Sequence, residues 1–482
     1  MNDALDALRE LGQQQLAAAD WPAAGETFGR VLAASPDDWQ ALAGRALAAY
    51  RLGAYDCALE DYCRALAIEP GALAVMINFA VLLKELGQLD SAEQLLLQAL
   101  HLAPEHADAW SNLGITRQHR LKYDEAAQCH INALEYGGES PARWCNLGNA
   151  FTGGLHLDEA VEAYDRALGL DPLFADAHYN RSIPLLTQGR YAEAWPDYEA
   201  RWQTILAPRW TDARWNGESL GAATLLIWSE QGLGDCLQMV RFIPLLRAAH
   251  PAARLVLACP DSLHALFACL GDVECVAADA RVAHDWQVPI CSLPGVLGID
   301  LAKLPRAPYL KADAQREAQW RDKLPPRRAG VPRVGIVWQS GIWGVGVRDL
   351  CRQYKSIDAE RFLPLPENIE FVSLQPGALP EAFAGRVLAA EIGDFADTAA
   401  LIAGLDLVIS VDTAAAHLAG AMGRPVWVLM RHEGAPFYGA SGEVAPWYPS
   451  ARVLRQTTPG DWAPVLSEMT SALKQHFQRS AQ

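Results

Sequence analysis

The sequence predicts two architectures in one chain, an α-helical solenoid followed by two α/β units that each contain a parallel sheet. Three observations carry this prediction. The first 207 residues repeat with a period of 34, short apolar runs alternate with helical segments from residue 224 onward, and the stretch 405–430 has the pattern of strand, small-residue helix and strand. We therefore expect three domains, at residues 1–207, 208–325 and 326–482.

Composition describes a globular chain, because 51% of its 482 residues are hydrophobic and 20% are charged. The N-terminal segment MNDALDALRELGQQQ lacks the basic and apolar regions of a secretory signal, and no apolar run reaches the ~20 residues that cross a bilayer. The ten cysteines contain no CxxC pair, so neither a zinc site nor a disulfide framework is expected. We expect a cytoplasmic protein with no membrane span, no bound metal and no resident cofactor.

The net charge of −17 is concentrated in the first part of the chain. Residues 1–207 carry 29 acidic and 14 basic side chains. Such a surface repels nucleic acid, so nucleic acid is excluded as a partner. Two interpretations stay open, attraction of a basic partner and a solvated surface that keeps the chain soluble.

The repeats are defined by a column of small residues that stand 34 apart: Ala24, Ala58, Ala92, Ala126, Ala160 and Ala194. Large side chains stand three residues before and four residues after most of these alanines. A small residue lets two helices approach closely while large neighbours fill the groove, and a proline near the end of most repeats stops the second helix. The pattern resembles the tetratricopeptide repeat, in six copies that start near residues 5, 39, 73, 107, 141 and 175.

A second column consists of asparagines in the first helix of four successive repeats: Asn78, Asn112, Asn146 and Asn180. In tetratricopeptide repeats this position faces the concave surface, and an amide can both donate to and accept from an extended peptide backbone. The similarity in layout to tetratricopeptide-containing protein O-GlcNAc transferases, which use such a ladder, favours a groove that binds a protein acceptor. The alternative is that the amides bond within the array.

The first α/β unit is predicted to have strands at 224–228, 254–258, 273–276 and 285–289, and helices at 236–249 and 263–270. Trp202, Trp210 and Trp215 predict a packed joint before it, because a flexible linker would be rich in Gly and Ser. The turn after the first strand reads GLGD, which places Gly234 and Asp235 at the carboxyl edge of the sheet. Asp235 is then either a helix cap or a general base that points into a facing cleft.

The second α/β unit is predicted to have strands at 334–338, 369–374, 405–411, 426–430 and 452–455, and helices at 399–404, from 414 to about 422, and at 462–477. Segment 339–356 is predicted as a loop that contains three glycines, two arginines and Lys355. A loop of this kind can adjoin a diphosphate, or it can be a surface loop with solvated charges.

The stretch 405–430 gives the second unit its predicted ligand site. Asp412 and Thr413 follow a buried strand and can cap the helix that begins near Ala414. Such a helix presents unpaired N–H groups and a positive dipole at the carboxyl edge of the sheet, where phosphate groups bind. The alternative is an ordinary strand–helix–strand unit without a ligand.

Taken in order, the motifs GLGD, VGIVW, FVSLQ and DFADTAALIAGLDLVISVDTAAAHLAGAMGRPVWVL resemble the heptosyltransferase-like family of GT-B glycosyltransferases, glycosyltransferase family nine. The resemblance covers residues 208–475 and is, more narrowly, to bacterial proteins that fuse tetratricopeptide repeats to such a domain. It implies metal-independent, inverting transfer of a sugar from a nucleotide-diphosphate sugar. Many relatives carry an Asn/His/Arg-rich loop after the VW strand, where this chain has GIWGVGVRDLCRQY.

The resemblance also implies roles for individual residues. Asp235 matches the proposed base of the family. The donor diphosphate is expected near these residues: Lys355, Ser356, Asp412, Thr413, Ala414 and Ala415. We expect four more residues to complete the donor site: Gly234, Gln339, Gln375 and His417.

We therefore expect a glycosyltransferase that moves a sugar to a hydroxyl of a macromolecular acceptor, a protein bound in the groove of the repeats. A lipopolysaccharide-type sugar transferase, a non-catalytic scaffold on a degenerate GT-B fold and a nucleotide-sugar epimerase are the alternatives. The intact Asp235 and VDT segment argue against the scaffold, and the repeat array argues against the epimerase. Self-association of the chain is left open.

Overall fold

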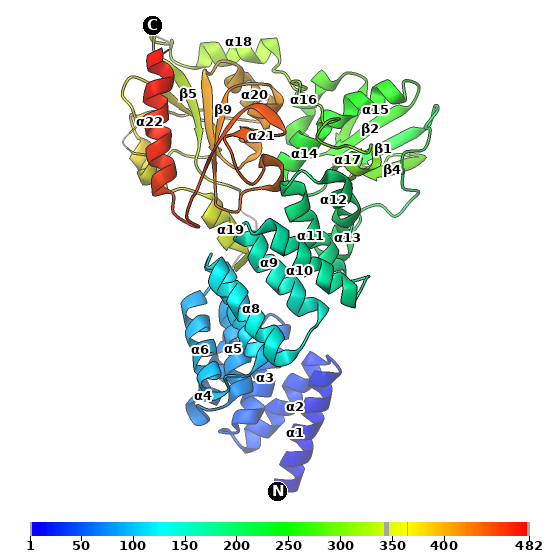
Figure 1. The fold of residues 1–482 in the computed structure, drawn as a ribbon, viewed down its shortest axis with the longest axis vertical. Helices are drawn as coiled ribbons and strands as arrows, with labels where there is room; N and C mark the ends of the chain where they lie inside the picture. Colours follow the sequence, from blue (N-terminus) through cyan, green and yellow to red (C-terminus); the bar gives the residue numbers. More distant parts are fainter. Residues whose placement is uncertain (1, 342–346, 364, 480–482) are drawn as a thin grey trace. The chain divides into compact units, whose positions relative to one another are not determined.

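A computed structural model describes residues 2–341, 347–363 and 365–479 (Figure 1). The chain forms two compact units, one built on residues up to 151 and the other on most of the residues from 152 onward. Each unit is described by itself. The three domains with limits at 207/208 and 325/326 stay a prediction.

The first unit is a series of antiparallel helical hairpins. The six alanines of the predicted column are fully buried, 0% exposed in every repeat, as close helix packing requires. Phe28 fills the space that this leaves, and a Cβ on Gly44 would lie 2.4 Å from its ring. The helices are α1 (Asn2–Ala17), α2 (Trp21–Ala34), α3 (Trp39–Arg51), α4 (Tyr55–Ile68), α5 (Leu73–Glu85), α6 (Leu89–Leu102), α7 (Ala107–His119), α8 (Tyr123–Gly137) and α9 (Pro141–Gly153).

The second unit begins with the end of the solenoid. Its first hairpins use the same packing, with Ala160 and Ala194 buried between helices. The last repeat is shorter than the others, because its second helix ends at Tyr198 and a separate turn follows. The helices here are α10 (Leu157–Leu170), α11 (Ala175–Thr187), α12 (Tyr191–Tyr198) and α13 (Arg201–Thr204).

A four-stranded parallel sheet follows, in the order β3-β2-β1-β4. Trp228 at the end of β1 pairs with Ala258 and Pro289, so these strands end at one carboxyl edge. The predicted joint is confirmed, because Trp202 and Trp210 pack on Trp228 with ring centroids 5.4 and 5.5 Å away. The elements are β1 (Thr224–Trp228), α14 (Leu233–Met239), η1 (Val240–Phe242), α15 (Ile243–Ala249), β2 (Arg254–Cys259), η2 (Asp261–Leu263), α16 (His264–Phe267), η3 (Ala268–Leu270), β3 (Val273–Ala277), β4 (Trp286–Pro289), η4 (Ile290–Ser292), α17 (Leu293–Val296) and α18 (Ala314–Lys323).

Two predicted helices are broken into shorter pieces. The helix predicted at 236–249 is divided into α14, η1 and α15, because Pro244 has no N–H for a bond to the carbonyl four residues earlier. The helix predicted at 263–270 is a single α-helical turn, α16, between two 3₁₀ turns.

A seven-stranded sheet forms the rest of the unit, in the order β10-β11-β9-β8-β5-β6-β7. Its strands are parallel except β10, which runs antiparallel to β11. Its elements are β5 (Arg333–Val337), α19 (Val347–Lys355), η5 (Ala359–Phe362), β6 (Glu370–Ser373), η6 (Glu381–Phe383), β7 (Val387–Leu388), α20 (Phe395–Ala403), β8 (Leu407–Val411), α21 (Ala414–Ala421), β9 (Val426–Met430), η7 (Pro436–Tyr438), β10 (Val444–Ala445), β11 (Tyr448–Arg455) and α22 (Ala463–Arg479).

The prediction of a loop at 339–356 is wrong in its second half, because Val347–Lys355 forms the helix α19. The segment VRDLCRQYK contains good helix formers and neither Gly nor Pro, which is sufficient for two turns of helix. Residues 342–346 of that loop lie outside the described residues.

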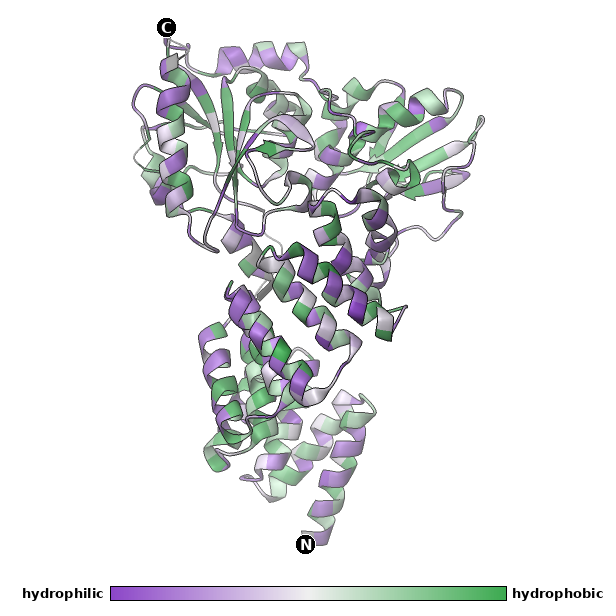
Figure 2. Cartoon of the chain, viewed as in Figure 1, coloured by the Kyte–Doolittle hydropathy of each residue, from purple (hydrophilic) through white to green (hydrophobic). Residues whose placement is uncertain are grey.

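Alternate residues of the central strands enter different hydrophobic cores. Val408 and Val428 pack with α20 and α21, whereas Ile409 and Leu429 pack with α22 on the opposite face. The strands are accordingly mostly hydrophobic in Figure 2, while most helices show one hydrophilic face. The fold class is confirmed as a tetratricopeptide-like solenoid followed by an α/β region with two sheets.

Candidate active site

A cavity of about 590 Å³ lies where α14, from the first sheet, meets α21, from the second. Both helices begin at the carboxyl edge of their sheets, because each follows a parallel strand directly. Val337 of β5 pairs with Ser410 of β8, so the loops after these strands also open at this edge. The cavity therefore occupies the position that ligands take in open α/β sheets.

The two helix N-termini are close because Gly234 has no side chain. A Cβ on Gly234 would lie 2.9 Å from Cδ2 of His417 and 3.8 Å from Cα of Ala414. Contacts as short as the first are essentially absent between real side chains, so any larger residue would push α14 and α21 apart. The glycine thus sets the width of the cavity between its two charged walls.

Asp235 both caps α14 and faces the cavity. Its Oδ2 accepts a hydrogen bond of 3.0 Å from the N–H of Gly232, in a capping box. Burial raises the pKa of the Asp235 carboxyl to about 6, the negative charge of Asp412 adds to the rise, and the Gly232 N–H and Lys355 oppose it. The capping role is therefore observed, and the raised pKa suits a group that exchanges a proton near neutral pH.

Opposite Asp235, Lys355 and Asp412 form an ion pair. Lys355 Nζ donates to Asp412 Oδ2 over 2.9 Å, and the Asp412 side chain is only 9% exposed. Burial opposes ionisation of Asp412, but Lys355, His417 and Arg431 together outweigh burial and lower the pKa of this carboxyl. The Asp412 carboxylate is therefore ionised at neutral pH.

His417 lies behind this ion pair as a neutral ring. Burial lowers the pKa of His417 to about 4, although Asp412 opposes the shift. Its Nδ1 lies 3.0 Å from the hydroxyl of Tyr448, and its Nε2 lies 3.7 Å from Asp412. The imidazole is thus fixed by a neighbour on each side and packs α21 against α14.

The start of α21 is built as expected for a helix that receives a ligand at its N-terminus. Thr413 is the extended N-cap residue, and its side chain does not cap the helix. Its Oγ1 instead lies 2.8 Å from Oγ of Ser410. The first N–H groups of α21 therefore stay available toward the cavity.

The predicted site residues divide into those that line this cavity and those that do not. Seven of them line it: Gly234, Asp235, Lys355, Asp412, Thr413, Ala414 and His417. Ala415, in the first turn of α21, is buried and does not line the cavity. Gln339 and Ser356 line a separate depression of about 450 Å³, where the Ser356 hydroxyl accepts from the N–H of Ser340. Gln375 accepts from the N–H of Gln339 through Oε1.

The asparagine column is partly used within the array. Asn112 Nδ2 donates to the carbonyl of Asp108 over 2.9 Å, and Asn146 Nδ2 lies 3.4 Å from Oγ of Ser111 in the preceding repeat. These bonds fit the alternative in which the amides stabilise the solenoid. The acceptor groove lined by Asn78, Asn112, Asn146 and Asn180 stays a prediction.

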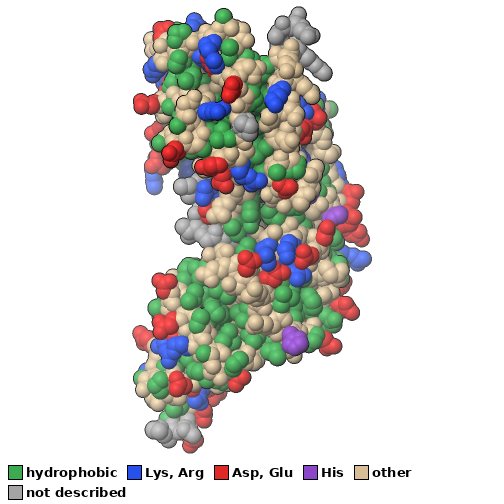
Figure 3. Space-filling model, turned by 90° about the vertical axis from the view of Figure 1, so that its left-hand side faces the viewer, with side chains coloured by type: hydrophobic (Ala, Val, Ile, Leu, Met, Phe, Trp, Pro, Cys, Tyr) green, Lys and Arg blue, Asp and Glu red, His purple; other side chains and the backbone are tan. Residues whose placement is uncertain are grey.

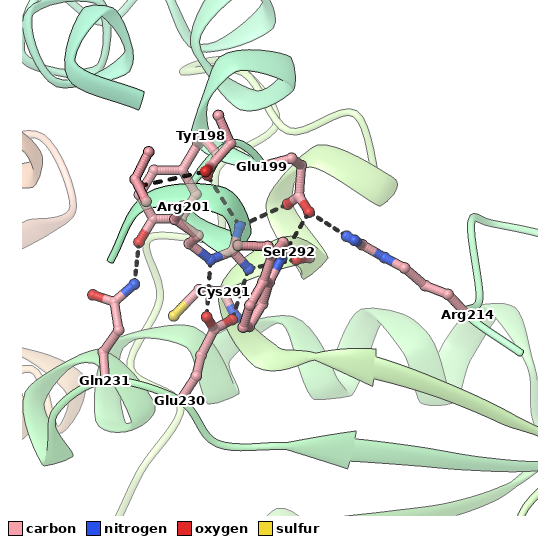
Figure 4. A network of polar contacts seen from close by, with 11 residues as sticks. Tyr198, Glu199, Arg201, Arg214, Glu230, Gln231, Cys291 and Ser292 are labelled. Atoms are coloured by element: carbon pink, nitrogen blue, oxygen red, sulfur yellow. Dashed lines mark hydrogen bonds and ion pairs between the residues drawn. The ribbon is translucent and has the colours of Figure 1, made fainter. Parts of the chain in front are cut away.

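A buried network around Arg201 was not predicted (Figure 4). Arg201 is 0% exposed and donates to both oxygens of Glu230 over 2.8 Å, to Glu199 over 2.9 Å and to the hydroxyl of Ser292 over 2.7 Å. Glu230 also accepts from the N–H of Cys291. The network joins α13, the last helical turn of the solenoid, to the loop after β1. The one sequence signal that could have indicated it is Glu230, a carboxylate two residues after a predicted strand.

The same loop holds Gln231 in a left-handed conformation, φ +59°, which is uncommon for a residue with a side chain. Gln231 Nε2 donates to the hydroxyl of Tyr198 over 2.6 Å. Both residues line the cavity. The solenoid therefore fixes one rim of the cavity through Tyr198 and Arg201.

Sequence comparison agrees with this architecture. Residues 49–114 match one tetratricopeptide repeat family and residues 9–72 and 145–209 match another. Residues 382–460 match Glycosyltransferase family 9 (heptosyltransferase). This range includes Asp412, which pairs with Lys355, and all of α21. The chain thus combines tetratricopeptide repeats with a glycosyltransferase family 9 domain.

Among curated proteins, the chain is similar to Protein FlbA of Caulobacter vibrioides, with 31% identity over 345 residues. The match covers 64% of this chain, more than the repeats or the α/β region alone contain, so it includes parts of both. The chain spans 56% of the length of that relative.

Solved structures resemble the solenoid at low similarity. PilW, a widely conserved type IV pilus biogenesis factor, has 18% identity and a TM-score of 0.40, covering 43% of this chain and 97% of that one. A thermophilic TPR protein in Thermus thermophilus has 25% identity and a TM-score of 0.34, covering 38% and 99%. Within the described ranges, no helix combines the length and hydropathy that a membrane crossing requires.

Proposed function

We propose that this protein transfers a sugar from a nucleotide-diphosphate sugar to a hydroxyl of a protein acceptor, with inversion and without a metal ion. One observation carries the proposal: a carboxyl with a raised pKa, Asp235, shares a cavity with the N-terminus of α21 and with Lys355. A base for the acceptor hydroxyl and a positive site for the leaving diphosphate are the two components that this reaction needs. The family 9 match supports glycosyl transfer in general.

In the proposed step, the acceptor oxygen attacks the anomeric carbon while its proton passes to the Asp235 carboxylate. The bond between that carbon and the diphosphate breaks, and negative charge develops on the diphosphate. The N–H groups at the start of α21 stabilise this charge, and they need no reorganisation during the step. Asp412 holds one proton of the Lys355 ammonium, which leaves its other donors for a phosphate oxygen.

The repeats support a protein as the acceptor, because tetratricopeptide arrays are protein-binding structures. The array continues into the α/β unit through the buried Arg201 network, so a peptide bound on the last repeat would lie near the cavity. A cytoplasmic location fits this assignment and stays a proposal.

The experiment incubates the purified protein with a panel of nucleotide sugars and measures release of the nucleoside diphosphate by mass spectrometry. We expect one donor to be hydrolysed slowly, equally well with EDTA present, at a rate that rises with pH around an apparent pKa of about 6. Sugar transfer to acceptor should fall at least ~100-fold in Asp235→Asn, which keeps the size and the Gly232 hydrogen bond but cannot accept the proton.

Gly234→Ala tests the cavity itself, because the added methyl group separates α14 from α21 and should weaken donor binding. Gly169→Ala is the matched control, since its Cβ meets nothing within 4 Å. Donor turnover that survives in Asp235→Asn and Gly234→Ala would place the chemistry elsewhere. Failure to turn over or bind any nucleotide sugar would favour a non-catalytic scaffold.

A further inference from the structure

Besides the two charged walls at α14 and α21, the cavity has a wall of apolar and aromatic side chains. Tyr179, Ile183 and Leu186 of α11 line it together with Phe437 of η7. These side chains are apolar or aromatic, whereas Asp235, Lys355 and Asp412 supply charged groups to the same cavity. We call the three α11 residues the α11 wall.

The α11 wall is one face of the last repeat. Its residues are spaced i, i+4 and i+7, so they lie on the same side of the helix. Tyr179 packs near Tyr198 with ring centroids 6.0 Å apart, and Tyr198 is bonded to Gln231, so the wall is fixed against the rim of the cavity. It is therefore a preformed surface.

This face is more apolar in the last repeat than in the two repeats before it, although the third repeat also carries apolar residues, Ile77 and Val81, at two of the equivalent positions. Thirty-four residues earlier, the equivalent positions carry small or polar residues: Cys145, Asn149 and Thr152. One repeat before that they are Ser111, Ile115 and Gln118. Stacking of repeats does not require the change, because the buried packing residues of α11 include others, among them Ala177 and Leu185.

We propose that the α11 wall binds an apolar side chain that neighbours the modified hydroxyl of a peptide acceptor. This inference rests on the proposed function. A diphosphate placed against the wall would lose its hydrogen bonds to water without replacement, so the phosphates of the donor belong at the charged side. The apolar side is left for the acceptor, whose hydroxyl must reach Asp235 on the adjoining helix α14.

The size of the wall favours a peptide over a lipid acceptor. Three side chains on one helix can cover a single residue-sized group, and the wall belongs to a repeat, a structure that binds proteins. Contact with one such pocket discriminates apolar side chains from smaller or polar ones by about 10- to 200-fold. The wall would therefore act as a specificity determinant, with the half-buried Tyr179 and Ile183 as its accessible part.

The experiment uses the full chain and an immobilised peptide array in which a central Ser or Thr is flanked by every residue type at the two positions on either side. The donor is the nucleotide sugar that the protein hydrolyses. Incorporated sugar and free nucleoside diphosphate are both measured by mass spectrometry. Ile183→Asn places the residue of the preceding repeat in the wall, and Leu173→Asn is the control, because Leu173 is 85% exposed and lies outside the cavity lining.

We expect the parent protein and Leu173→Asn to prefer an apolar residue at one flanking position by at least ~10-fold. Ile183→Asn should lose that preference when its transfer to each peptide is expressed relative to its own rate of donor hydrolysis. An unchanged preference in Ile183→Asn would overturn the assignment, and so would donor hydrolysis without sugar on any peptide. Absence of donor hydrolysis in the parent protein would instead contradict the proposed function on which the assignment depends.

Discussion

The carboxyl of Asp235 accepts a backbone hydrogen bond from Gly232 in a place where a positive and a negative side chain act on it in opposite directions. Lys355 favours its ionised form, and burial together with Asp412 favours the protonated form. The balance leaves the pKa at about 6. At neutral pH the group is therefore mostly ionised, and its pKa lies close enough to the ambient pH for it both to accept and to release a proton.

This residue should make stability depend on pH. The folded protein binds the Asp235 proton more tightly than the unfolded chain, where the pKa of Asp is about 3.9, so stability falls as pH rises from about 4 to about 6. We expect Asp235→Asn to raise the free energy of unfolding at pH 8 by roughly 3 kcal/mol at most, and by much less at pH 4. Thermal unfolding at the two pH values measures this, and equal shifts at both would contradict it.

His130 is a second residue whose environment does not match its chemistry. It is 0% exposed in the column otherwise occupied by residues such as Phe28 and Tyr62, and neither ring nitrogen has a partner among the described residues. Burial lowers the pKa of His130 to about 4, so the ring is neutral. Two desolvated polar atoms therefore weaken the fourth repeat.

We expect His130→Phe to stabilise the array by about 1–3 kcal/mol, because it removes the unpaired polar atoms and keeps a flat ring. Gly114 faces His130 as Gly44 faces Phe28, so the site has the room for a phenyl ring. Chemical unfolding followed by helical circular dichroism measures the change. Destabilisation would mean that a group outside the described contacts pairs with the imidazole.

Among the secondary-structure elements, α13 is unusual because it has four residues and yet joins the solenoid to the first sheet. Its stability comes from tertiary contacts, since four residues cannot form a stable helix alone. The buried pair of Arg201 and Glu230 supplies the largest of them. Breaking a buried pair is costly because the remaining charge has no compensation.

We expect Arg201→Met to destabilise the second unit by about 3–5 kcal/mol, because it leaves Glu230 charged and buried. Arg201→Met combined with Glu230→Gln should be less harmful than Arg201→Met alone, since the orphaned charge is then gone. Melting temperatures of the two single variants and the double variant complete the cycle. Strictly additive losses would show that the two side chains do not interact.

The local sequence pattern predicts secondary structure better than it predicts contacts between residues that are distant in the chain. The strands at 224–228 and 426–430 were predicted at their observed limits, because buried parallel strands are continuous apolar runs. The contact of Lys355 with Asp412 was not foreseen as an ion pair, since it joins residues 57 positions apart through the packing of β5 and β8. The sequence pattern did not reveal the α11 wall, because its residues also fit a tetratricopeptide repeat. Only a comparison with the equivalent positions of the preceding repeat shows that they are more apolar.

At the scale of the whole molecule, the boundary between the two compact units does not coincide with the end of the repeats. The last repeat is part of the α/β body: Trp195 donates to the carbonyl of Ile299 over 2.8 Å, and Trp447 donates to the hydroxyl of Tyr191 over 2.6 Å. Figure 3 shows apolar side chains reaching the surface of the solenoid between acidic ones, so the solenoid is not uniformly polar. The sixth repeat thus serves both the array and the cavity.

We expect a fragment of residues 155–482 to fold and a fragment of residues 208–482 to aggregate. The longer fragment keeps Arg201, Trp195 and Tyr191 on their partners, whereas the shorter one exposes apolar surface and leaves Glu230 unpaired. Size-exclusion chromatography and thermal unfolding of the two fragments decide this. A monomeric, cooperatively melting 208–482 fragment would show that the sixth repeat is dispensable for the α/β fold.

The part of the cavity lining that comes from the solenoid belongs to the sixth repeat, from Tyr179 onward, and five repeats precede it in the sequence. Each of those repeats is a self-similar 34-residue cassette. Whole cassettes can therefore be added, removed or exchanged upstream while the chemical step keeps its surroundings. Related chains could in this way address different targets with one reaction centre, and a designer could retarget the protein by swapping cassettes ahead of residue 155.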